Sequence, residues 1–371
     1  DGPPPEAGER IAGALWGLFI GDALAMPVHW YYGGPDQVRR DFGGKLLHGY
    51  EKAVHPFPES IMQLSNTGGG GRGSNEGDVV GSVILHGKKE YWRRGGQYHY
   101  HIALEAGENT LEASLARLLM RTIADGNGAF SPDAFREEYV RFMTTPGTHN
   151  DSYASTCHRM FFKNWRDGKP PAECPDNDGH NVDSIDGLIL PAVVLLAELG
   201  AGRSTWEALD GALKALAVTR SSRELPAYVE VMADLLAGVL EGEPLDAVAQ
   251  RVAQQRYGGD LGREVSRRGD SDPIVACYIG GSFPALLHFA YKYAASPVEE
   301  ALLASANAGG ENVHRGALLG ALVGAAASAE RIPPQFRTGL FAHAELEEEI
   351  ARFVGAVSQV GRGRTGQGSE L

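Results

Sequence analysis

Residues 306–325 read ANAGGENVHRGALLGALVGA, and this stretch decides the fold. Its second half repeats glycine, alanine and leucine, a pattern that predicts a buried helix over Gly316–Ala327. Its first half places polar residues, Glu311 and Asn312 among them, after two glycines and before that helix. Helix starts present free N–H groups and a positive dipole end, so we expect this segment to bind an anion or to cap the helix with a carboxylate.

A second stretch of similar character lies near the beginning of the chain. From about Glu9, apolar and small residues recur at Ile11, Leu15, Leu18, Phe19 and Ala23. This spacing predicts a buried helix, and its glycine and alanine positions permit close contact with another helix. The helix runs into the segment GDALAMP, residues 21–27.

Helical periodicity returns in most of the remaining chain. We expect further helices at Asn109–Ala124, Pro132–Met143, Leu188–Leu199, Thr205–Ala217, Leu225–Leu240, Leu245–Gln255, Ser271–Tyr293, Pro297–Asn307 and Leu346–Gly355. Runs of alternating β-branched residues, which would indicate strands, are nearly absent. The sequence therefore predicts an all-α fold, an orthogonal multi-helix bundle with no large sheet.

One segment, near residues 33–97, departs from this pattern. It is rich in glycine, histidine and aromatic residues and poorly periodic, so we expect a long irregular loop excursion. Its glycine-rich run at residues 66–73 lacks the Lys-Ser or Lys-Thr of a P-loop and is interpreted as a loop or lid, in which Arg72 could approach a phosphate. Around the excursion we predict one domain over residues 9–358, with a disordered lead-in at residues 1–8 and a disordered tail at residues 359–371.

Composition and charge narrow the class of partner. The chain has 371 residues, of which 43% are hydrophobic, enough for a substantial core. Its formal net charge is −13 and its pI is near 5.4, so the average surface field repels phosphate backbones and anionic membranes. We expect a small-molecule substrate and neither nucleic acid nor a membrane as partner. The oligomeric state is left open.

Cysteine usage and hydropathy bear on the compartment. Cys157, Cys174 and Cys277 form no CxxC pair and no even framework, which favours a reducing compartment, either the cytoplasm or an organelle lumen. The most apolar uninterrupted run, Ile189–Ala197, is about half the length that a membrane-spanning helix needs. Because the sequence begins at Asp1, a removed leader peptide cannot be judged from it.

Three motifs carry a resemblance to a known family. They are GDALAMP at residues 21–27, GENTL at residues 107–111, and the stretch 306–325 followed by Ile332-Pro333. In this order and spacing they resemble the signatures of the ADP-ribosylglycohydrolase superfamily over roughly residues 9–340. The resemblance implies the all-α fold of that family and a hydrolase that cleaves glycosidic bonds.

The resemblance also implies a pair of divalent cations, usually magnesium, held by aspartates of two motifs. In this chain the first motif reads Gly107-Glu108-Asn109-Thr110, and in the second Glu311 and Val313 stand where aspartates are expected. Hard cations prefer several carboxylate oxygens, and four aspartates are here reduced to two glutamates. The cofactor is therefore left open, with magnesium or another divalent cation as the candidate. Two other family positions also differ, with His29 in place of a glutamate and Arg220 in place of a histidine.

The altered motifs supply the candidate site residues. We expect Glu108, Glu311 and His314 to act in catalysis, because a carboxylate beside a histidine can be tuned for acid and base work. The alternative is a purely structural role, in which these polar residues only cap helices. Substrate-binding candidates in and near the motifs are Asp22, His29, Asn109, His149, Asn150, Asp151, Asn312 and Arg315.

Two histidines precede the first motif in the segment Gln97-Tyr98-His99-Tyr100-His101. Their alternation would place both rings on one side of an extended segment. His99 and His101, together with Glu108 and Glu311 or with His314, could then bind a transition metal such as zinc, or act as acid and base.

These observations predict a hydrolase-like enzyme that acts on a small, polar, ribosyl-like substrate at a glycosidic or amide-type bond. In this hypothesis Glu, Asn and His replace the metal-binding aspartates of the family. The alternative is a non-catalytic descendant, either a ligand sensor or a structural protein comparable to the lens crystallin that resembles this superfamily. A lyase or transferase on the same scaffold is a further alternative, because fold does not determine chemistry.

Overall fold

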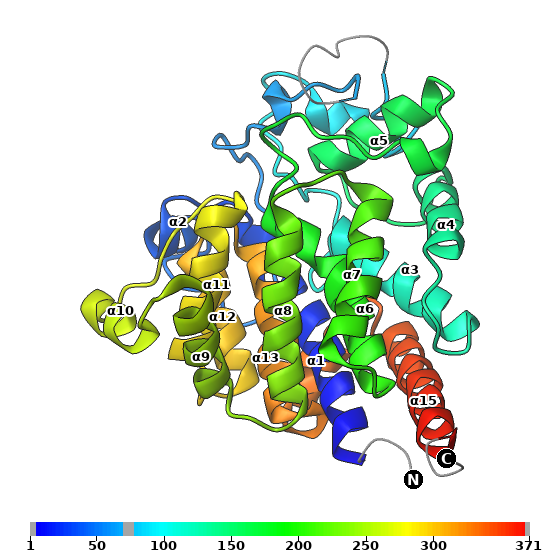
Figure 1. Ribbon diagram of the computed structural model, residues 1–371. Coiled ribbons are helices and arrows are strands. Elements are labelled where there is room, and N and C mark those ends of the chain that lie inside the picture. Colours follow the sequence, from blue (N-terminus) through cyan, green and yellow to red (C-terminus); the bar gives the residue numbers. More distant parts are fainter. Residues whose placement is uncertain (1–4, 70–77, 368–371) are drawn as a thin grey trace.

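Two helices rich in glycine form the centre of the molecule. The computed structural model describes residues 5–69 and 78–367, and in it α1 (Pro5–Ala25) packs antiparallel against α13 (Asn312–Ala327). Figure 1 shows this pair, dark blue and orange, inside a ring of other helices. A Cβ placed on Gly17 would lie 1.9 Å from the carbonyl oxygen of Gly320, so only glycine permits this approach. The small residues that mark the two stretches thus hold the bundle together.

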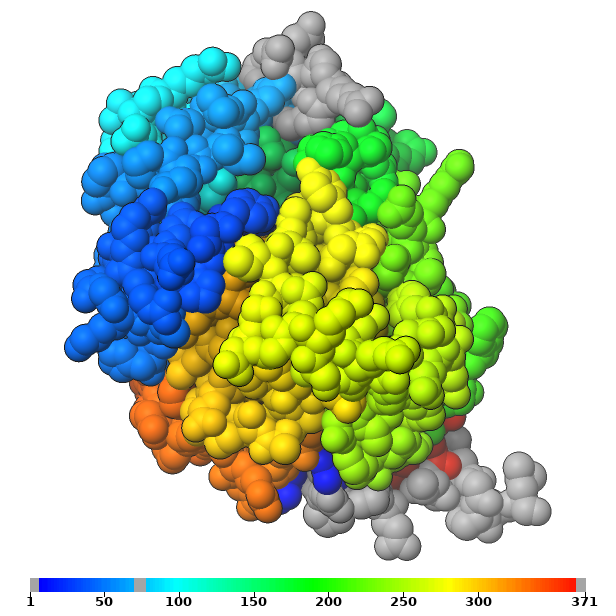
Figure 2. All heavy atoms as spheres, turned by 90° about the vertical axis from the view of Figure 1, so that its left-hand side faces the viewer, coloured from blue at the N-terminus to red at the C-terminus, as the bar shows by residue number. Residues whose placement is uncertain are grey.

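The other helices surround this pair. On one side lie the helices of the middle of the chain, α3 (Leu111–Asp125), α4 (Pro132–Thr144), α5 (Thr156–Arg166), α6 (Ile189–Gly200), α7 (Thr205–Thr219) and α8 (Leu225–Leu240). The remaining helices are α2 (Gly34–Asp41), α9 (Leu245–Tyr257), α10 (Leu261–Arg268), α11 (Ile279–Lys292), α12 (Val298–Ala308), α14 (Pro334–Thr338) and α15 (His343–Gln367). Figure 2 looks onto the face where α2, in dark blue, and α10, in yellow, reach the surface.

The all-α prediction is confirmed. Within the described residues the only β-pairing consists of isolated bridges. The helix predicted at Leu225–Leu240 has those bounds in the structure. The helix predicted from Ser271 begins only at Ile279, because the carbonyl oxygens of Val275 and Cys277 accept hydrogen bonds from Glu311 N–H and Ile185 N–H instead of bonding within a helix.

The segment at residues 33–97 is mostly irregular, as expected. It opens with the helix α2, which the sequence did not predict because Val38 is the one hydrophobic residue among its eight. Beyond α2 the described part of the segment holds two short 3₁₀ turns, Met62–Leu64 and Lys89–Trp92. Residues 70–73, the second half of the glycine-rich run with Arg72, lie outside the described residues.

The chain ends differ from the predicted bounds. Helix α1 already begins at Pro5, inside the predicted lead-in, because proline is well suited to the first helical position. Helix α15 continues to Gln367, beyond the predicted end of order at residue 358, and Val360 packs against the core there. The 22-residue segment Ala7–Val28, which includes most of α1, is long and apolar enough to cross a bilayer, a feature that the sequence reading did not single out. Since 94% of its most apolar window is buried inside the protein, its burial matches that of a central bundle helix.

Candidate functional site

The loops that follow α1 and precede α13 are joined by backbone hydrogen bonds. The N–H of Trp30 donates to Gly310 O (3.0 Å), and the N–H of Gly310 donates to Tyr31 O (3.0 Å). Gly309 adopts a φ of +79°, and a Cβ there would lie 2.1 Å from Tyr31 O, so this contact requires glycine. The two family-like motifs are thereby brought together, with His29 facing Glu311.

Glu311 lies at the centre of a buried cluster. Its Oε1 is 2.9 Å from Nε2 of His29, and its Oε2 is 3.1 Å from Nδ1 of His314. Oε1 also accepts the backbone N–H of His314 at 3.2 Å. The carboxylate therefore caps α13, which is the structural role that the sequence analysis gave as the alternative to catalysis. The Glu311 carboxylate therefore caps α13 and contacts His29 and His314 at the same time, so its structural role does not exclude a role in chemistry.

The cluster continues on the far side of His29. Nδ1 of His29 is 2.7 Å from Nε2 of His101, and Nδ1 of His101 is 2.8 Å from Oδ1 of Asp151. The other oxygen of Asp151 accepts the N–H of Leu111 at 2.8 Å, which fixes the carboxylate at the start of α3. We call the residues Asp151, His101, His29, Glu311 and His314 the Glu311 chain.

Hydrogen counting constrains this chain. Three hydrogen bonds link Asp151 to Glu311 through the two imidazoles, and each needs one hydrogen. Two neutral imidazoles supply two N–H groups, and ionised carboxylates supply none. A third proton, or another positive charge in its place, must therefore occupy the segment between the two carboxylates.

Electrostatic interactions shift the pKa values of Glu311 and His314, the two residues at one end of the Glu311 chain. Burial by itself would raise the pKa of the Glu311 carboxyl, but His29 and His314 hold that pKa well below its ordinary value. Burial by itself would lower the pKa of His314, but Glu311, with Asp186 and Asp22 farther off, raises it to about 10. Glu311 is accordingly a carboxylate and His314 an imidazolium near neutral pH.

Asp22 holds the first altered motif against α1. Its Oδ2 accepts the N–H of Thr110 (2.9 Å) and Nδ2 of Asn109 (3.0 Å), and its Oδ1 accepts the Thr110 hydroxyl (2.6 Å). Asn109 also donates to Phe19 O. Glu108 points elsewhere: its Oε1 accepts the N–H of Glu105 at 2.8 Å, and burial of this half-exposed carboxyl raises its pKa. No hydrogen bond given by the described residues links Glu108 with Glu311.

Four other predicted ligand-binding residues are engaged in local structure. Asn312 donates to Val28 O and Ala306 O, while its buried Oδ1 has no hydrogen-bond partner among the described residues. Arg315 is fully buried and donates to Ser305 O and Gly309 O, at the C-terminal end of α12 where a cation is favoured.

The loop before α5 holds the remaining two. His149 stacks on Phe142 and accepts the N–H of Asp151 through Nδ1. Asn150 donates to Ala103 O and accepts from Lys88 Nζ. Both residues therefore shape the loop that presents Asp151 to His101.

The grouping of metal-ligand side chains differs from the predicted set. His29, Glu311 and His314 offer ligand atoms within 4.8 Å of one another, whereas Glu108 and His99 join no such group among the described residues. His99 is buried, and its Nδ1 accepts the backbone N–H of His101 at 3.0 Å. A second group, Glu112, Cys157 and His158, lies in a separate buried network.

These residues do not fit the pair of magnesium ions that the family resemblance implies. Both oxygens of Asp22 are occupied by donors of the first motif, and Asn109 is turned to donate rather than accept. Glu311 supplies the remaining carboxylate, between two histidines, and Val313 offers no ligand atom. A pair of hard cations requires more carboxylate oxygens than this arrangement provides.

An aromatic group flanks the Glu311 chain. The ring of Trp30 stacks on His29 with centroids 3.7 Å apart and an interplanar angle of 11°, and Tyr100 and Tyr153 meet its edges. Trp30 has a φ of +60°, an unusual conformation for a bulky residue, and is partly exposed. Strained residues of this kind concentrate at functional sites, and this ring presents a face next to the buried histidine.

A second buried network was missed by the sequence reading. Arg220 donates to Asp186 (3.2 Å) and to Glu112 (3.4 Å), Glu112 contacts Nε2 of His158, and Nδ1 of His158 meets the hydroxyl of Tyr139 at 2.6 Å. The signal for it was Arg220 itself, an arginine where the family has a histidine. The network approaches the Glu311 chain through Asp186, whose charge helps to raise the pKa of His314.

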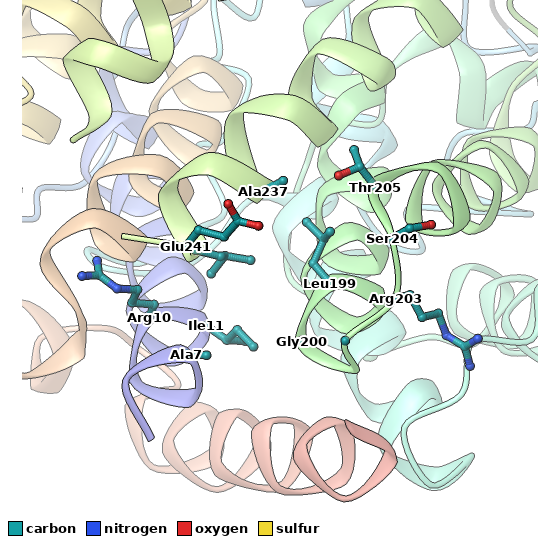
Figure 3. Close-up of a pocket in the computed structure, with 12 residues that line it drawn as sticks. Ala7, Arg10, Ile11, Leu199, Gly200, Arg203, Ser204, Thr205, Ala237 and Glu241 are labelled. Carbon is teal, nitrogen blue, oxygen red and sulfur yellow. The ribbon is translucent and has the colours of Figure 1, made fainter. Parts of the chain in front are cut away.

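A cavity of about 740 Å³ lies elsewhere, lined by Ala7, Ile11, Leu199 and neighbouring residues (Figure 3). Ile11 belongs to the first half of α1, whereas His29 follows the end of the same helix. With a rise of about 1.5 Å per residue, the two lie roughly 20 Å or more apart along the helix axis. This cavity is therefore not part of the Glu311 site.

Comparisons with known proteins agree with the fold. A family model described as ADP-ribosylglycohydrolase matches residues 3–363. A solved structure titled "ADP-ribosylglycohydrolase-related protein complex" aligns with a TM-score of 0.58 and 21% identity, covering 96% of this chain and 100% of that one. At this identity the structural likeness shows the fold alone. Among curated proteins no match was found.

Proposed function

Since the chain belongs to the ADP-ribosylglycohydrolase family, whose members are hydrolases, we propose that it hydrolyses a small polar substrate at the Glu311 chain. The observation that carries the proposal is the continuous line of hydrogen bonds from Asp151 through His101 and His29 to Glu311. A carboxylate–imidazole line of this kind can accept a proton at one end and redistribute it along its length.

Each residue of the chain has a distinct role in this proposal. Glu311 takes the proton from the attacking water, and the Asp151–His101 pair orients His29, which holds the Glu311 carboxylate in place. His314, held as an imidazolium by Glu311, is the acid that donates to the departing group. Asp22 acts through others, because it fixes the first motif rather than meeting the substrate.

The aromatic group indicates the substrate class. The indole of Trp30, a partly exposed residue stacked on His29, belongs to an aromatic group that suits a flat or ring-shaped ligand such as a sugar or a nucleobase. We therefore propose ribosyl compounds with an N- or O-glycosidic bond as the first class to test, followed by small amides.

The near-complete burial of His29, Glu311 and Asp151 favours the second candidate, a non-catalytic protein in which the chain only ties loops together. In that case the same contacts would serve stability alone. The two candidates differ in what removal of the charge at Glu311 does to turnover.

The test is hydrolysis of a panel of ribosyl N- and O-glycosides and small amides by wild-type protein and by Glu311→Gln. Glu349→Gln is the control, since Glu349 is a partly buried glutamate that accepts from Arg117 and Arg121 away from the site. We expect turnover in wild type and control, and a loss of at least ~100-fold in kcat in Glu311→Gln. No hydrolysis of any panel member by wild type would remove the hydrolase proposal and leave the structural one.

A further inference from the structure

We infer that His29, Glu311 and His314 form a binding site for one divalent ion of the borderline transition-metal class, such as zinc or cobalt. The inference rests on the hydrolase proposed above for its catalytic meaning, and in the ion-bound protein His314 is a neutral ligand in place of the acid. Binding itself is measurable without turnover. It differs from the magnesium pair of the family in metal class, in number of ions and in the residues used.

The ligand atoms are already close to the required spacing. Two ligands of a tetrahedral zinc ion at about 2.0–2.1 Å lie about 3.3 Å apart. Here Nε2 of His29 lies 2.9 Å from Glu311 Oε1, and Nδ1 of His314 lies 3.1 Å from Glu311 Oε2. Because the three ligand atoms all fall within 4.8 Å of one another, small side-chain rotations would gather them around one ion.

The outer contacts of His29 are those of a metal ligand. Histidine ligands donate their second ring N–H to a carboxylate or another acceptor, which fixes the ring and its tautomer. His29 directs Nδ1 at Nε2 of His101, and His101 directs Nδ1 at Asp151, with all three side chains buried. With hydrogens on both Nδ1 atoms, Nε2 of His29 is left with a lone pair directed at Glu311.

Hydrogen counting supports the same conclusion. Without an ion, the line between the two carboxylates needs a third proton to complete its hydrogen bonds. With an ion between His29 and Glu311, two neutral imidazoles complete both remaining bonds and no further proton is needed. The cation takes the place of the extra proton and neutralises Glu311 in the buried interior.

The donor set selects the metal class. Two imidazoles and one carboxylate suit zinc and related first-row ions and leave coordination positions for water or substrate. Magnesium prefers oxygen ligands in octahedral geometry, and one carboxylate with two nitrogens provides little of that. His29 in place of a glutamate and Glu311 in place of an aspartate therefore favour a different class of metal.

The test is metal uptake by tag-free, full-length protein that has been stripped with a chelator. Zinc and magnesium are measured by inductively coupled plasma mass spectrometry after gel filtration, and cobalt by its visible absorption bands. The variants are Glu311→Gln, His314→Gln and Asp151→Asn. The last keeps an oxygen for the Leu111 N–H, so it should fold even if loss of the α13 cap unfolds Glu311→Gln. The control is Asp272→Asn, which alters another His–Asp pair, the partly buried His288 and Asp272, 2.8 Å apart.

We expect one zinc or cobalt ion per chain in wild type and control, with no stoichiometric magnesium. Stoichiometric binding should be lost in Glu311→Gln and His314→Gln and weakened about 10- to 100-fold in Asp151→Asn. Substoichiometric zinc and cobalt in wild type, or equal uptake by wild type and all three variants, would overturn the inference. Metal uptake without hydrolysis of any panel member would support the metal site and contradict the proposed hydrolase. Hydrolysis by protein that takes up no metal would support the hydrolase and contradict the metal site.

Discussion

Nε2 of His29 lies 2.9 Å from Oε1 of Glu311, although 282 positions separate the two residues in the sequence. The contact exists because α1 and α13 pack antiparallel at glycine-to-glycine distance, which places the loop after one helix beside the loop before the other. The packing that builds the bundle therefore also builds the candidate site.

The α1–α13 contact should be intolerant of a single methyl group. A Cβ on Gly320 would lie 1.9 Å from Gly17 O, so Gly320→Ala must push the two helices apart. We expect a loss of about 3 kcal/mol or more of unfolding free energy, measured by urea denaturation. Gly355→Ala in α15, where a Cβ meets nothing within 4 Å, is the control and should be stabilising by about 0.5–1 kcal/mol. Equal stability of Gly320→Ala and wild type would show that the helices are not in this contact.

Glu108 should be dispensable for turnover. Its carboxylate accepts a backbone N–H from Glu105 instead of joining Glu311. A glutamine at this position keeps an oxygen for that N–H, so Glu108→Gln should have kcat within about threefold of wild type. Steady-state kinetics on the best panel substrate checks this. A loss in kcat as large as that of Glu311→Gln would mean that the two glutamates act as a pair, as the sequence alone suggested.

Trp30 should act on substrate binding. Trp30→Ala removes the indole face beside His29, and loss of one ring stack predicts a rise of about 3- to 10-fold in KM with little change in kcat. Trp206→Ala is the control, because this tryptophan is 79% exposed on α7. If KM stays at the wild-type value in Trp30→Ala, the indole is not the substrate platform.

Stability should fall in alkaline solution because of His158. Burial by itself lowers the pKa of this imidazole, but Cys157 and Glu112 raise it from an ordinary 6.5 to about 10, with Arg220 and Tyr139 also in the surrounding network. Since the folded pKa is the higher one, this contribution is complete below about pH 6.5 and is lost as the pH rises to about 10.

The measurement is urea denaturation at several pH values between 6.5 and 10. We expect the wild-type free energy of unfolding to decrease over this range more steeply than that of His158→Gln, which carries no titrating ring. Parallel curves for the two proteins would show that His158 is not charged in the folded state.

The fold was predictable because periodicity and small residues act locally. Leu225–Leu240 is a helix with a continuous apolar face, and its bounds follow from the sequence. Helix α10 was missed because it is short and mostly exposed, so packing rather than a long pattern determines it. The onset of α11 was misplaced because the residues before Ile279 form hydrogen bonds with loops that are distant in the sequence, at Ile185 and Glu311.

The site was predictable in its members but not in its connections. Glu311, His314, His29, His101 and Asp151 were all candidates from their motifs, yet they had been divided among catalytic, metal and substrate-binding roles. Their joining depends on the register of three loops, which no local pattern encodes. Arg220 and Glu112 could not have been paired from sequence, because 108 positions separate them.

The assignment of the Glu311 chain as the reaction centre is tested most directly by the kcat of Glu311→Gln. This kcat is compared with those of wild type and Glu349→Gln on the best substrate of the ribosyl and amide panel. Circular dichroism checks that each protein is folded. We expect the folded Glu311→Gln protein to lose at least ~100-fold in kcat, while Glu349→Gln keeps wild-type turnover. Wild-type turnover by a folded Glu311→Gln protein would contradict the assignment of the Glu311 chain as the reaction centre.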